Sequence, residues 1–162
     1  MKKAFTLIEV MVVLVILSIL AVASVPVITG YQRGVEVDTV AETIVSKLRY
    51  AQSKSIVGEG TDTWGIHFDT TDPDQNFVSL FHGVSYAAGT DIEPFYLING
   101  ARLSNLALQG GGNDIFFQRL SGTTSQFGAG AGNQAVCVTQ SNNPAACMIS
   151  IVVTERGKIG IE

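Results

Sequence analysis

A long apolar segment near the N-terminus constrains this chain more than any other feature of its sequence. Every residue from Val10 to Ile28 is apolar except Ser18, Ser24 and Pro26. These 19 residues approach the ~20 that an α-helix needs to cross a bilayer. We therefore expect this segment to form a helix that lies in a membrane.

The distribution of charge predicts how that helix is oriented. Lys2 and Lys3 precede the apolar segment, and the next basic residue is Arg33. Because basic residues mark the cytoplasmic side, the N-terminus is expected in the cytoplasm and the rest of the chain across the membrane. The chain is 46% hydrophobic and 15% charged, with a net charge of -4. This composition excludes an intrinsically disordered chain and argues against a general nucleic-acid binder.

A cleaved secretory signal and a simple membrane anchor both leave observations unexplained. No small-x-small cleavage site directly follows a short apolar core, and the helical pattern continues past Ile28. A simple anchor fits better but does not explain Glu9. A carboxylate at the start of a membrane helix costs free energy, so it is expected to have a function. Glu9 is therefore a functional candidate that needs a positively charged partner.

The residues around Glu9 carry a specific motif. Lys2–Glu9 has the sequence Lys-Lys-Ala-Phe-Thr-Leu-Ile-Glu, and an apolar run follows it. This string resembles the type IV prepilin signature of type IV pilins, type II secretion pseudopilins and DNA-uptake pilins. The resemblance implies that a prepilin peptidase removes the leader, residues 1–4, by cutting between Ala4 and Phe5, and then methylates the Phe5 amine. The usual residue before the cut is Gly, so Ala4 is expected to slow cleavage.

The resemblance also implies how the mature chain assembles. Residues 5–28 would form a transmembrane and filament-core helix, with Pro26 where such helices commonly kink. The Phe5 amine of a neighbouring subunit would approach Glu9 and set the axial register. Such pairing would offset the cost of burying a lone carboxylate. A Glu9 at the level of the lipid headgroups, without a partner, is the alternative.

The implied partners are the prepilin peptidase, other pilin or pseudopilin subunits and an inner-membrane assembly platform. The implied location is the bacterial inner membrane, crossed once, with a cytoplasmic N-terminus and a periplasmic C-terminal domain. The chain would then move into a pilus or pseudopilus.

Residues 29–57 are predicted to continue the helix as an amphipathic segment. Pro26, Gly30 and Gly34 weaken the helix locally. The resemblance to pilins implies that the helix softens here when a filament packs. Gly58 is the predicted C-cap. Apolar residues at i, i+3 and i+4 spacing form one stripe, which is expected to pack on a globular domain: Val37, Val40, Ala41, Ile44, Leu48 and Ala51.

Residues 58–162 are predicted to form that globular domain, which is rich in strands. A turn over 69–74 is expected to join the first two strands. The resulting fold class is α+β and pilin-like, with one long helix packed on a mostly antiparallel β-sheet. Strands are predicted at 64–68, 77–81, 95–98, 115–118, 135–138, 148–153 and 158–161.

Further motifs favour one branch of the family. The helix end Leu48–Ser55, the run Ile115–Arg119 with Gly122, and a last hairpin through Arg156–Ile159 occur in the chain. Their order resembles the GspH/FimT group, which includes minor pseudopilins and minor pilins. Residues 69–112 fit that pattern only loosely.

Cys137 and Cys147 are the chain's two cysteines. Translocation would place them in an oxidising compartment, where a disulfide is favoured. They would then end two adjacent strands and close the loop between Thr139 and Ala146. Two free buried thiols remain the alternative. A zinc site would need more Cys or His at ligand spacing, so no metal is assigned here.

Three other groups of residues have weaker claims to function. Asp69, Asp72, Asp74 and Asn76 offer oxygen ligands for calcium, but the spacing lacks the glycine and terminal Glu of an EF-hand loop, so a solvated turn is preferred. His67 and His82 lie in predicted strands without a nucleophile motif, which argues against catalysis. The glycine-rich segment 128–132 lacks the Lys-Ser/Thr ending of a phosphate loop.

Arg156 and Lys158 are the residues with which this chain could contact DNA, as some pilins of this group do through basic C-terminal residues. Glu155 and Glu162 lie beside them in the sequence. Two basic residues would give only weak, salt-sensitive binding, so solvated charges in a hairpin turn are preferred.

The sequence thus predicts a non-enzymatic assembly subunit without a cofactor. A minor pseudopilin or minor pilin is the first interpretation. A main-shaft type IV pilin would have the same apolar helix, and a DNA-binding pilin for DNA uptake is a third interpretation. Nucleic acid is not an expected partner.

Overall fold

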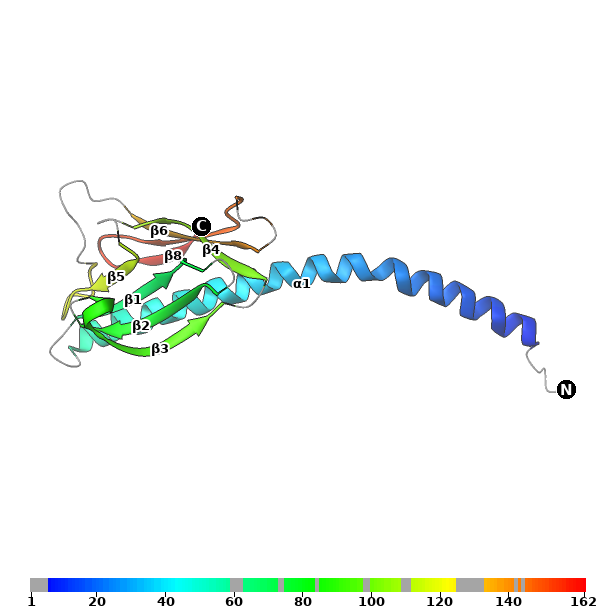
Figure 1. Cartoon of the computed structure of the whole chain (residues 1–162), viewed down its shortest axis with the longest axis horizontal. Coiled ribbons are helices and arrows are strands. Elements are labelled where there is room, and N and C mark those ends of the chain that lie inside the picture. The colour runs from blue at the N-terminus through cyan, green and yellow to red at the C-terminus, as the bar shows by residue number, and fades with distance from the viewer. Residues whose placement is uncertain are drawn as a thin grey trace.

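One helix runs from near the N-terminus to the far end of the molecule, and a β-rich domain packs on its second half (Figure 1). This is seen in a computed structural model of the full chain. The structure describes residues 6–58, 63–72, 75–83, 85–97, 100–108, 112–124, 133–141, 143 and 145–162.

The helix α1 spans Leu7–Val57, 51 residues or about 75 Å. Thr6 caps its start, and its side chain accepts a hydrogen bond from the backbone N–H of Glu9 at 3.4 Å. Gly58 ends it in the left-handed conformation at φ 72°, which confirms the predicted C-cap. The helix continues through Pro26, so the softening expected in a packed filament stays a prediction.

Two antiparallel four-stranded sheets form the globular domain, where the sequence had predicted one. The first sheet contains β1 (Trp64–Asp69), β2 (Phe77–His82), β3 (Thr90–Tyr96) and β5 (Asp114–Phe117). The second contains β4 (Ala101–Ala107), β6 (Gln134–Gln140), β7 (Ile149–Val153) and β8 (Ile159–Ile161). The first sheet has the order β3-β2-β1-β5, and the second has the order β4-β6-β7-β8. Strands β1 and β2 pair as expected, with Ile66 opposite Leu80.

Strand β4 is absent from the sequence prediction, whereas β1, β2, β5, β6, β7 and β8 fall where strands were predicted. The third predicted strand, 95–98, overlaps only the end of β3, and Ile98 lies outside the described residues. A short 3-10 helix, η1 (Tyr86–Ala88), precedes β3. These findings confirm the α+β class and correct the number of sheets.

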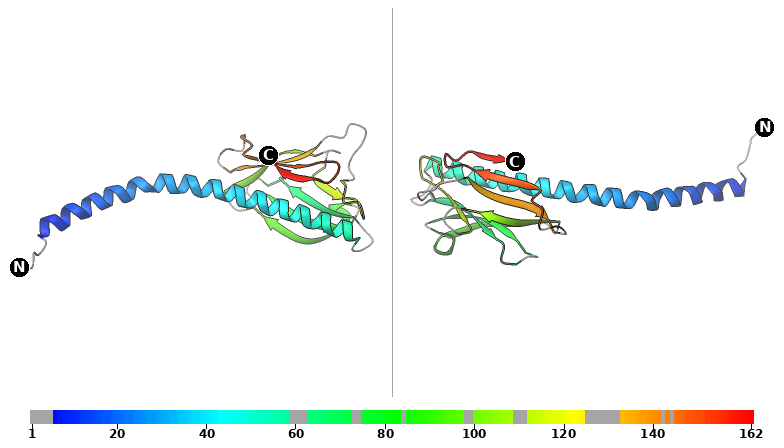
Figure 2. Two further views of the ribbon diagram at one scale, coloured as in Figure 1. Left: turned by 180° about the vertical axis from the view of Figure 1, so that it is seen from behind. Right: turned by 90° about the horizontal axis from the view of Figure 1, so that it is seen from above.

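The core lies between the second half of α1 and the inner faces of both sheets (Figure 2). The predicted helix stripe from Val37 to Ala51 is buried and belongs to one hydrophobic cluster with Ile66, Phe68 and Val136. Burial of such side chains is worth about 1.5–3 kcal/mol each, and this is what fixes the domain to the helix.

Two polar side chains tie the sheets together at opposite ends of the domain. Near the start of β2, Asn76 accepts a buried hydrogen bond at 2.9 Å from the backbone N–H of Leu103 in β4. At the other end, the amide of Gln52 in α1 donates to the carbonyl oxygens of Gly122 at 2.9 Å and Gly157 at 2.7 Å. Gly122 follows β5 and Gly157 lies between β7 and β8, so Gln52 joins the helix to both sheets.

Gly157 cannot be replaced without moving that junction. Its φ is +77°, and a Cβ there would lie 2.3 Å from the carbonyl oxygen of Gly122. The turn between β7 and β8 can therefore approach the Gly122 turn only because residue 157 has no side chain.

Candidate functional site

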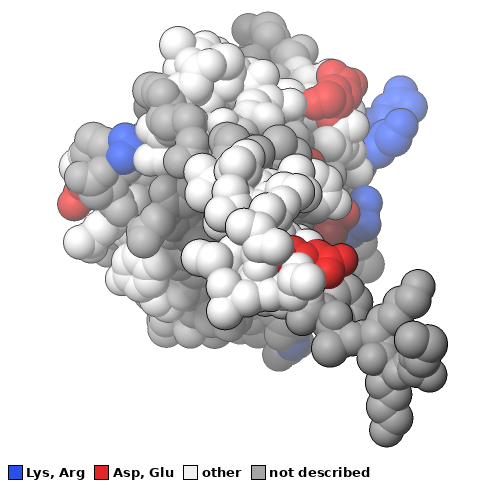
Figure 3. Space-filling view, turned by 90° about the vertical axis from the view of Figure 1, so that its right-hand side faces the viewer, with Lys and Arg blue, Asp and Glu red and all other residues white. Residues whose placement is uncertain are grey.

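The first candidate site is the apolar stem, which we define as Leu7–Val22 of α1. Its large apolar side chains are exposed on every side of the helix, from 49% for Val10 to 78% for Leu7. A helix that is apolar all round is normally buried in a large core or a membrane. Viewed from the end at which the helix projects, the surface in front is mostly uncharged (Figure 3). The stem therefore needs cover that its own globular domain does not supply.

Glu9 is the acidic residue in the first turn of the helix. Thr6 as the N-cap and Glu9 three residues later match the Thr-x-x-Glu pattern of a capping box, although only the bond to the Thr6 hydroxyl is observed. A negative charge there also interacts favourably with the positive end of the helix dipole. This local role could have been recognised from the Thr6-Leu7-Ile8-Glu9 pattern, and it does not exclude pairing with a neighbour.

The structure describes little of the other predicted processing and assembly residues. Ala4 and Phe5 lie outside the described residues. Pro26 lies within α1, but its side chain is outside the described part. Among the described residues, no helix is long and apolar enough to span a membrane.

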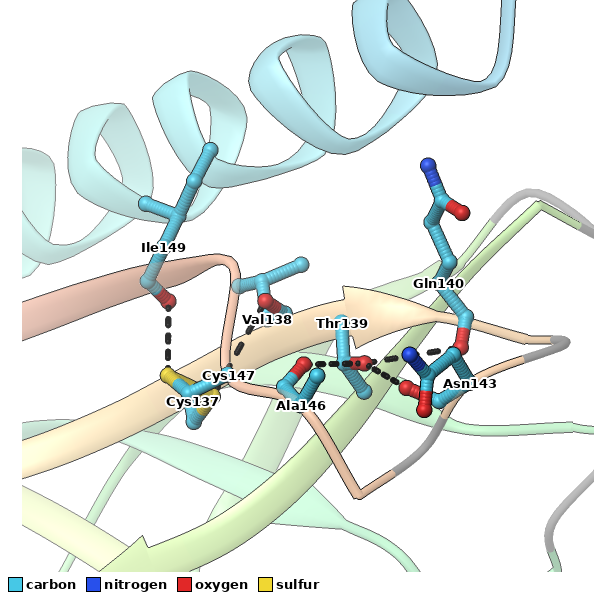
Figure 4. Close-up of a disulfide and its surroundings, with 8 residues drawn as sticks. All are labelled: Cys137, Val138, Thr139, Gln140, Asn143, Ala146, Cys147 and Ile149. Atoms are coloured by element: carbon cyan, nitrogen blue, oxygen red, sulfur yellow. Dashed lines mark hydrogen bonds between the residues drawn. A yellow bond between two sulfur atoms is a disulfide. The ribbon is translucent and has the colours of Figure 1, made fainter. Parts of the chain in front are cut away.

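The cysteines form the predicted disulfide (Figure 4). The Cys137 and Cys147 sulfurs are 2.02 Å apart, and their Cα atoms are 5.6 Å apart. Cys147 precedes β7, but Cys137 lies within β6, which corrects the expectation that both cysteines end strands. Thr139 supports the closed loop, because its hydroxyl lies 2.7 Å from the carbonyl oxygen of Asn143 and 2.8 Å from that of Ala146.

The predicted DNA-contacting residues lie at the end of the domain where α1 ends. Arg156 and Lys158 are exposed on the turn between β7 and β8, with exposed Glu155 beside them. Arg119 is also at this end, and its guanidinium donates to the carbonyl oxygen of Gly58 at 3.3 Å. The sequence did not group Arg119 with Arg156 and Lys158, because the fold alone brings the two turns together.

Comparisons with known proteins agree with this geometry. Residues 1–25 match the family model described as the prokaryotic N-terminal methylation motif. The chain therefore carries an N-terminal methylation motif. Its structure is similar to that of the minor pseudopilin EpsH from the type 2 secretion system of Vibrio cholerae, with a TM-score of 0.56. The two share 13% sequence identity, and the match covers 78% of this chain and 96% of the EpsH chain. A search of curated protein sequences gives no match.

Two side chains of the acidic turn, Asp69 and Asn76, form hydrogen bonds with the backbone of the turn. The carboxylate of Asp69 accepts the N–H of Thr71 at 2.7 Å, and this bond lowers the pKa of Asp69. The side chain of Asn76 donates to the carbonyl oxygen of Asp72 at 2.8 Å. Asp74 lies outside the described residues. Within the described part of the chain, no group of three or more His, Cys, Asp or Glu is placed to hold a metal ion.

The two histidines contact aromatic rings, and His67 also contacts a carboxylate. His67 lies 2.5 Å from a carboxylate oxygen of Asp114 and stacks on the ring of Tyr86 at 3.9 Å between centroids. His82 lies against Trp64, with ring centroids 5.5 Å apart. Asp114 and Tyr86 were not predicted as partners, because neither is close to His67 in sequence. The contacts of Tyr86 with His67 and Asp114 hold η1 on the first sheet.

Proposed function

We propose that the chain is a minor pseudopilin or minor pilin, a structural subunit of a type II secretion pseudopilus or a type IV pilus. The observation that carries this proposal is the exposed apolar stem, which lies within the matched methylation motif and is joined to a domain with a pilin-like fold. Covering such a stem with lipid or other subunits is favourable, because it removes apolar side chains from water. The subunit acts by polymerisation and carries out no reaction of its own.

In this proposal the helix over residues 5–28 first holds the precursor in the inner membrane, with its globular domain in the periplasm. A prepilin peptidase removes residues 1–4 and methylates Phe5, which becomes the new N-terminal residue. An inner-membrane assembly platform then transfers the subunit from lipid into a filament. The apolar contacts with lipid are thereby exchanged for contacts with the helices of neighbouring subunits.

Processing is tested by mass spectrometry of the chain from a host that contains a prepilin peptidase. The expected N-terminal peptide begins at methylated Phe5. An intact Met1 would contradict the processing step. Ala4→Gly should give the same product with faster cleavage, because Gly is the usual residue at this position.

Glu9 is proposed to pair with the Phe5 amine of a neighbouring subunit and so set the axial register. Glu9→Ala should lower incorporation into filaments while the globular domain keeps its unfolding midpoint. Glu162→Ala, which removes an exposed carboxylate from the domain, is the matched control and should assemble normally. Equal incorporation of both variants would reject the role of Glu9.

Two other functions are tested directly. A main-shaft pilin would dominate the protein of sheared filaments, whereas a minor subunit would be rare there. A DNA-uptake pilin would shift a DNA fragment in a gel, and Arg156→Ala with Lys158→Ala would remove that shift. The observation that favours DNA binding is that Arg119 lies at the same end of the domain as Arg156 and Lys158.

A further inference from the structure

The loop between β6 and β7 lies at the end of the domain from which the stem projects (Figure 1, Figure 2). We define the disulfide loop as residues 141–148. It begins beside the helix, because the backbone N–H of Ser141 donates to the carbonyl oxygen of Gly100 at 3.0 Å, and Gly100 lies against the carboxylate of Glu36. The loop is therefore level with the start of the buried helix stripe and faces the side of the stem.

The disulfide loop is exposed, uncharged and held in one shape. Its sequence carries no charge, because no Asp, Glu, Lys or Arg occurs between Arg119 and Glu155. The disulfide to Cys137 and the hydroxyl of Thr139 hold its backbone. Its exposed side chains are those of Asn143, Ala145, Ala146, Cys147 and Met148. Such a surface loses little on leaving water, because it has no charge to desolvate.

The length of the helix places this end of the domain close to a bilayer. The proposed membrane segment ends at Ile28, and Glu36 is eight residues further, or about 12 Å along the helix. The headgroup layer fills about 5–7 Å of that distance. Tyr31, which is 75% exposed, lies within it, where tyrosine is enriched in membrane proteins. A helix tilt of ~20°, the average in membranes, would bring one side of the domain onto the lipid.

The first sheet presents an acidic side at this end. Strand β1 begins at Trp64, whose ring lies beneath the Lys54 ammonium in the last turn of α1, and it runs back towards the stem. The turn after β1 carries half-buried Asp69 and exposed Asp72, and Asp74 lies outside the described residues. An anionic membrane surface repels such a turn.

The second sheet presents the neutral disulfide loop with a base beside it. Arg102 is that base, because it lies opposite Thr139 in the register of β4 and β6. On the helix, Glu36 is half-buried and Asp38 is exposed, whereas the side chain of Arg33 is outside the described part. These helix charges change little in height when the helix tilts, so they do not select a side. The two sheets do, because an anionic surface attracts Arg102 and repels the acidic turn.

We propose that the disulfide loop of the membrane-held subunit rests on the lipid headgroups, with the acidic turn of the first sheet facing away. This contact rests on the proposed function, in which the stem lies in the inner membrane. It adds a lipid contact outside the helix and fixes the direction in which the domain leans. Ala145, Ala146 and Met148 offer little apolar area, so the contact is reversible and breaks when the subunit leaves the membrane.

Fluorescence quenching by lipid tests the contact. The full chain is reconstituted in vesicles of phosphatidylethanolamine and phosphatidylglycerol that contain a lipid with a nitroxide on its headgroup. Trp64 is the one tryptophan of the chain and is 9% exposed, so the wild type gives the background. Ala145→Trp should lose most of its added fluorescence. Gln75→Trp, at an exposed position after the acidic turn, is the matched control and should keep it. Equal quenching at both positions, or none at 145, would overturn the proposal.

A charge in the loop tests the contact without changing the fold. In the Ala145→Trp chain, Ala146→Asp should lower the ratio of bound to free loops by about fivefold, because one like charge faces an anionic surface. Ala146→Ser is the control of similar size and should be quenched as before. Both should keep the unfolding midpoint, because Ala146 is exposed. The same quenching in both variants would reject the loop as the contact.

Flotation of the same vesicles in a density gradient separates this proposal from the proposed function. A chain that floats with the vesicles but is not quenched at position 145 overturns only the contact of the loop. A chain that does not float overturns the membrane-held subunit and the loop contact with it.

Discussion

The two halves of α1 form one continuous helix, but only the second half is covered by the rest of its own chain. The second half buries one stripe, from Val37 to Ala51, against two sheets of its own chain. The stem exposes large apolar side chains on every face and contacts no described strand (its residues are absent from the hydrophobic cluster). Folding of this chain therefore buries only the second half of its longest helix. In the proposed function, lipid or neighbouring subunits cover the other half.

The largest predicted effect tests that division directly. Leu48→Ala removes a fully buried side chain and should lower the free energy of unfolding by about 2–5 kcal/mol. Leu14→Ala makes the same chemical change in the exposed stem and should leave domain stability unchanged. Denaturant unfolding of the two variants in detergent measures both. Equal destabilisation would show that the stem contributes to the fold of the domain.

The disulfide should stabilise the domain without influencing the stem. Replacement of both Cys137 and Cys147 by Ala should cost roughly 2–3 kcal/mol, because the unfolded chain regains the freedom of the closed loop. Thermal unfolding of the variant and of reduced wild type should give the same loss. A variant as stable as the oxidised wild type would contradict this role.

The sheet connection at Asn76 should have a smaller effect. Asn76→Ala leaves the buried N–H of Leu103 without its acceptor and should cost about 1–3 kcal/mol. Asn143→Ala, at an exposed position in the disulfide loop, is the control and should be neutral. If Asn76→Ala and Asn143→Ala have the same free energy of unfolding, the connection between the sheets does not depend on Asn76.

The smallest effect is the pH dependence from Asp69. The N–H of Thr71 lowers the pKa of this carboxyl, so its ionised form stabilises the folded state. That stabilisation is present at neutral pH and is lost as the pH falls through the lowered pKa of the folded state. Asp69→Asn should therefore unfold at a slightly lower temperature than wild type at pH 7, and the difference should shrink below the ordinary carboxyl pKa of 3.8. A difference that does not change with pH would exclude this cause.

Local patterns in the sequence predicted much of the fold. The spacing of apolar residues located the buried helix stripe, and alternation located most strands. Strand β4 was missed because its sequence, ARLSNLA, alternates poorly, and Asn105 within it adopts φ 48° where the register shifts. The division into two sheets could not be predicted, because it depends on which distant strands pair, such as β5 with β1.

The candidate sites divide in the same way. The prepilin-like motif is contiguous, so residues 2–9 were enough to recognise it. The end of the domain at which α1 ends combines Ile56, Leu120 and Arg156 from three separated segments, and no sequence pattern links them. Its unusual feature, a leucine in the left-handed region, is a property of the backbone and leaves no signal in the sequence.

The junction at Gln52 also has a consequence for the order of folding. Its two acceptors are 70 and 105 residues further along the chain. Because synthesis proceeds from the N-terminus, Gln52 cannot form its second hydrogen bond until Gly157 has been synthesised. Contacts of such high sequence separation close slowly, so the two sheets should lock onto the helix end late. The last turn of the domain to be synthesised is therefore the one that completes its rigidity.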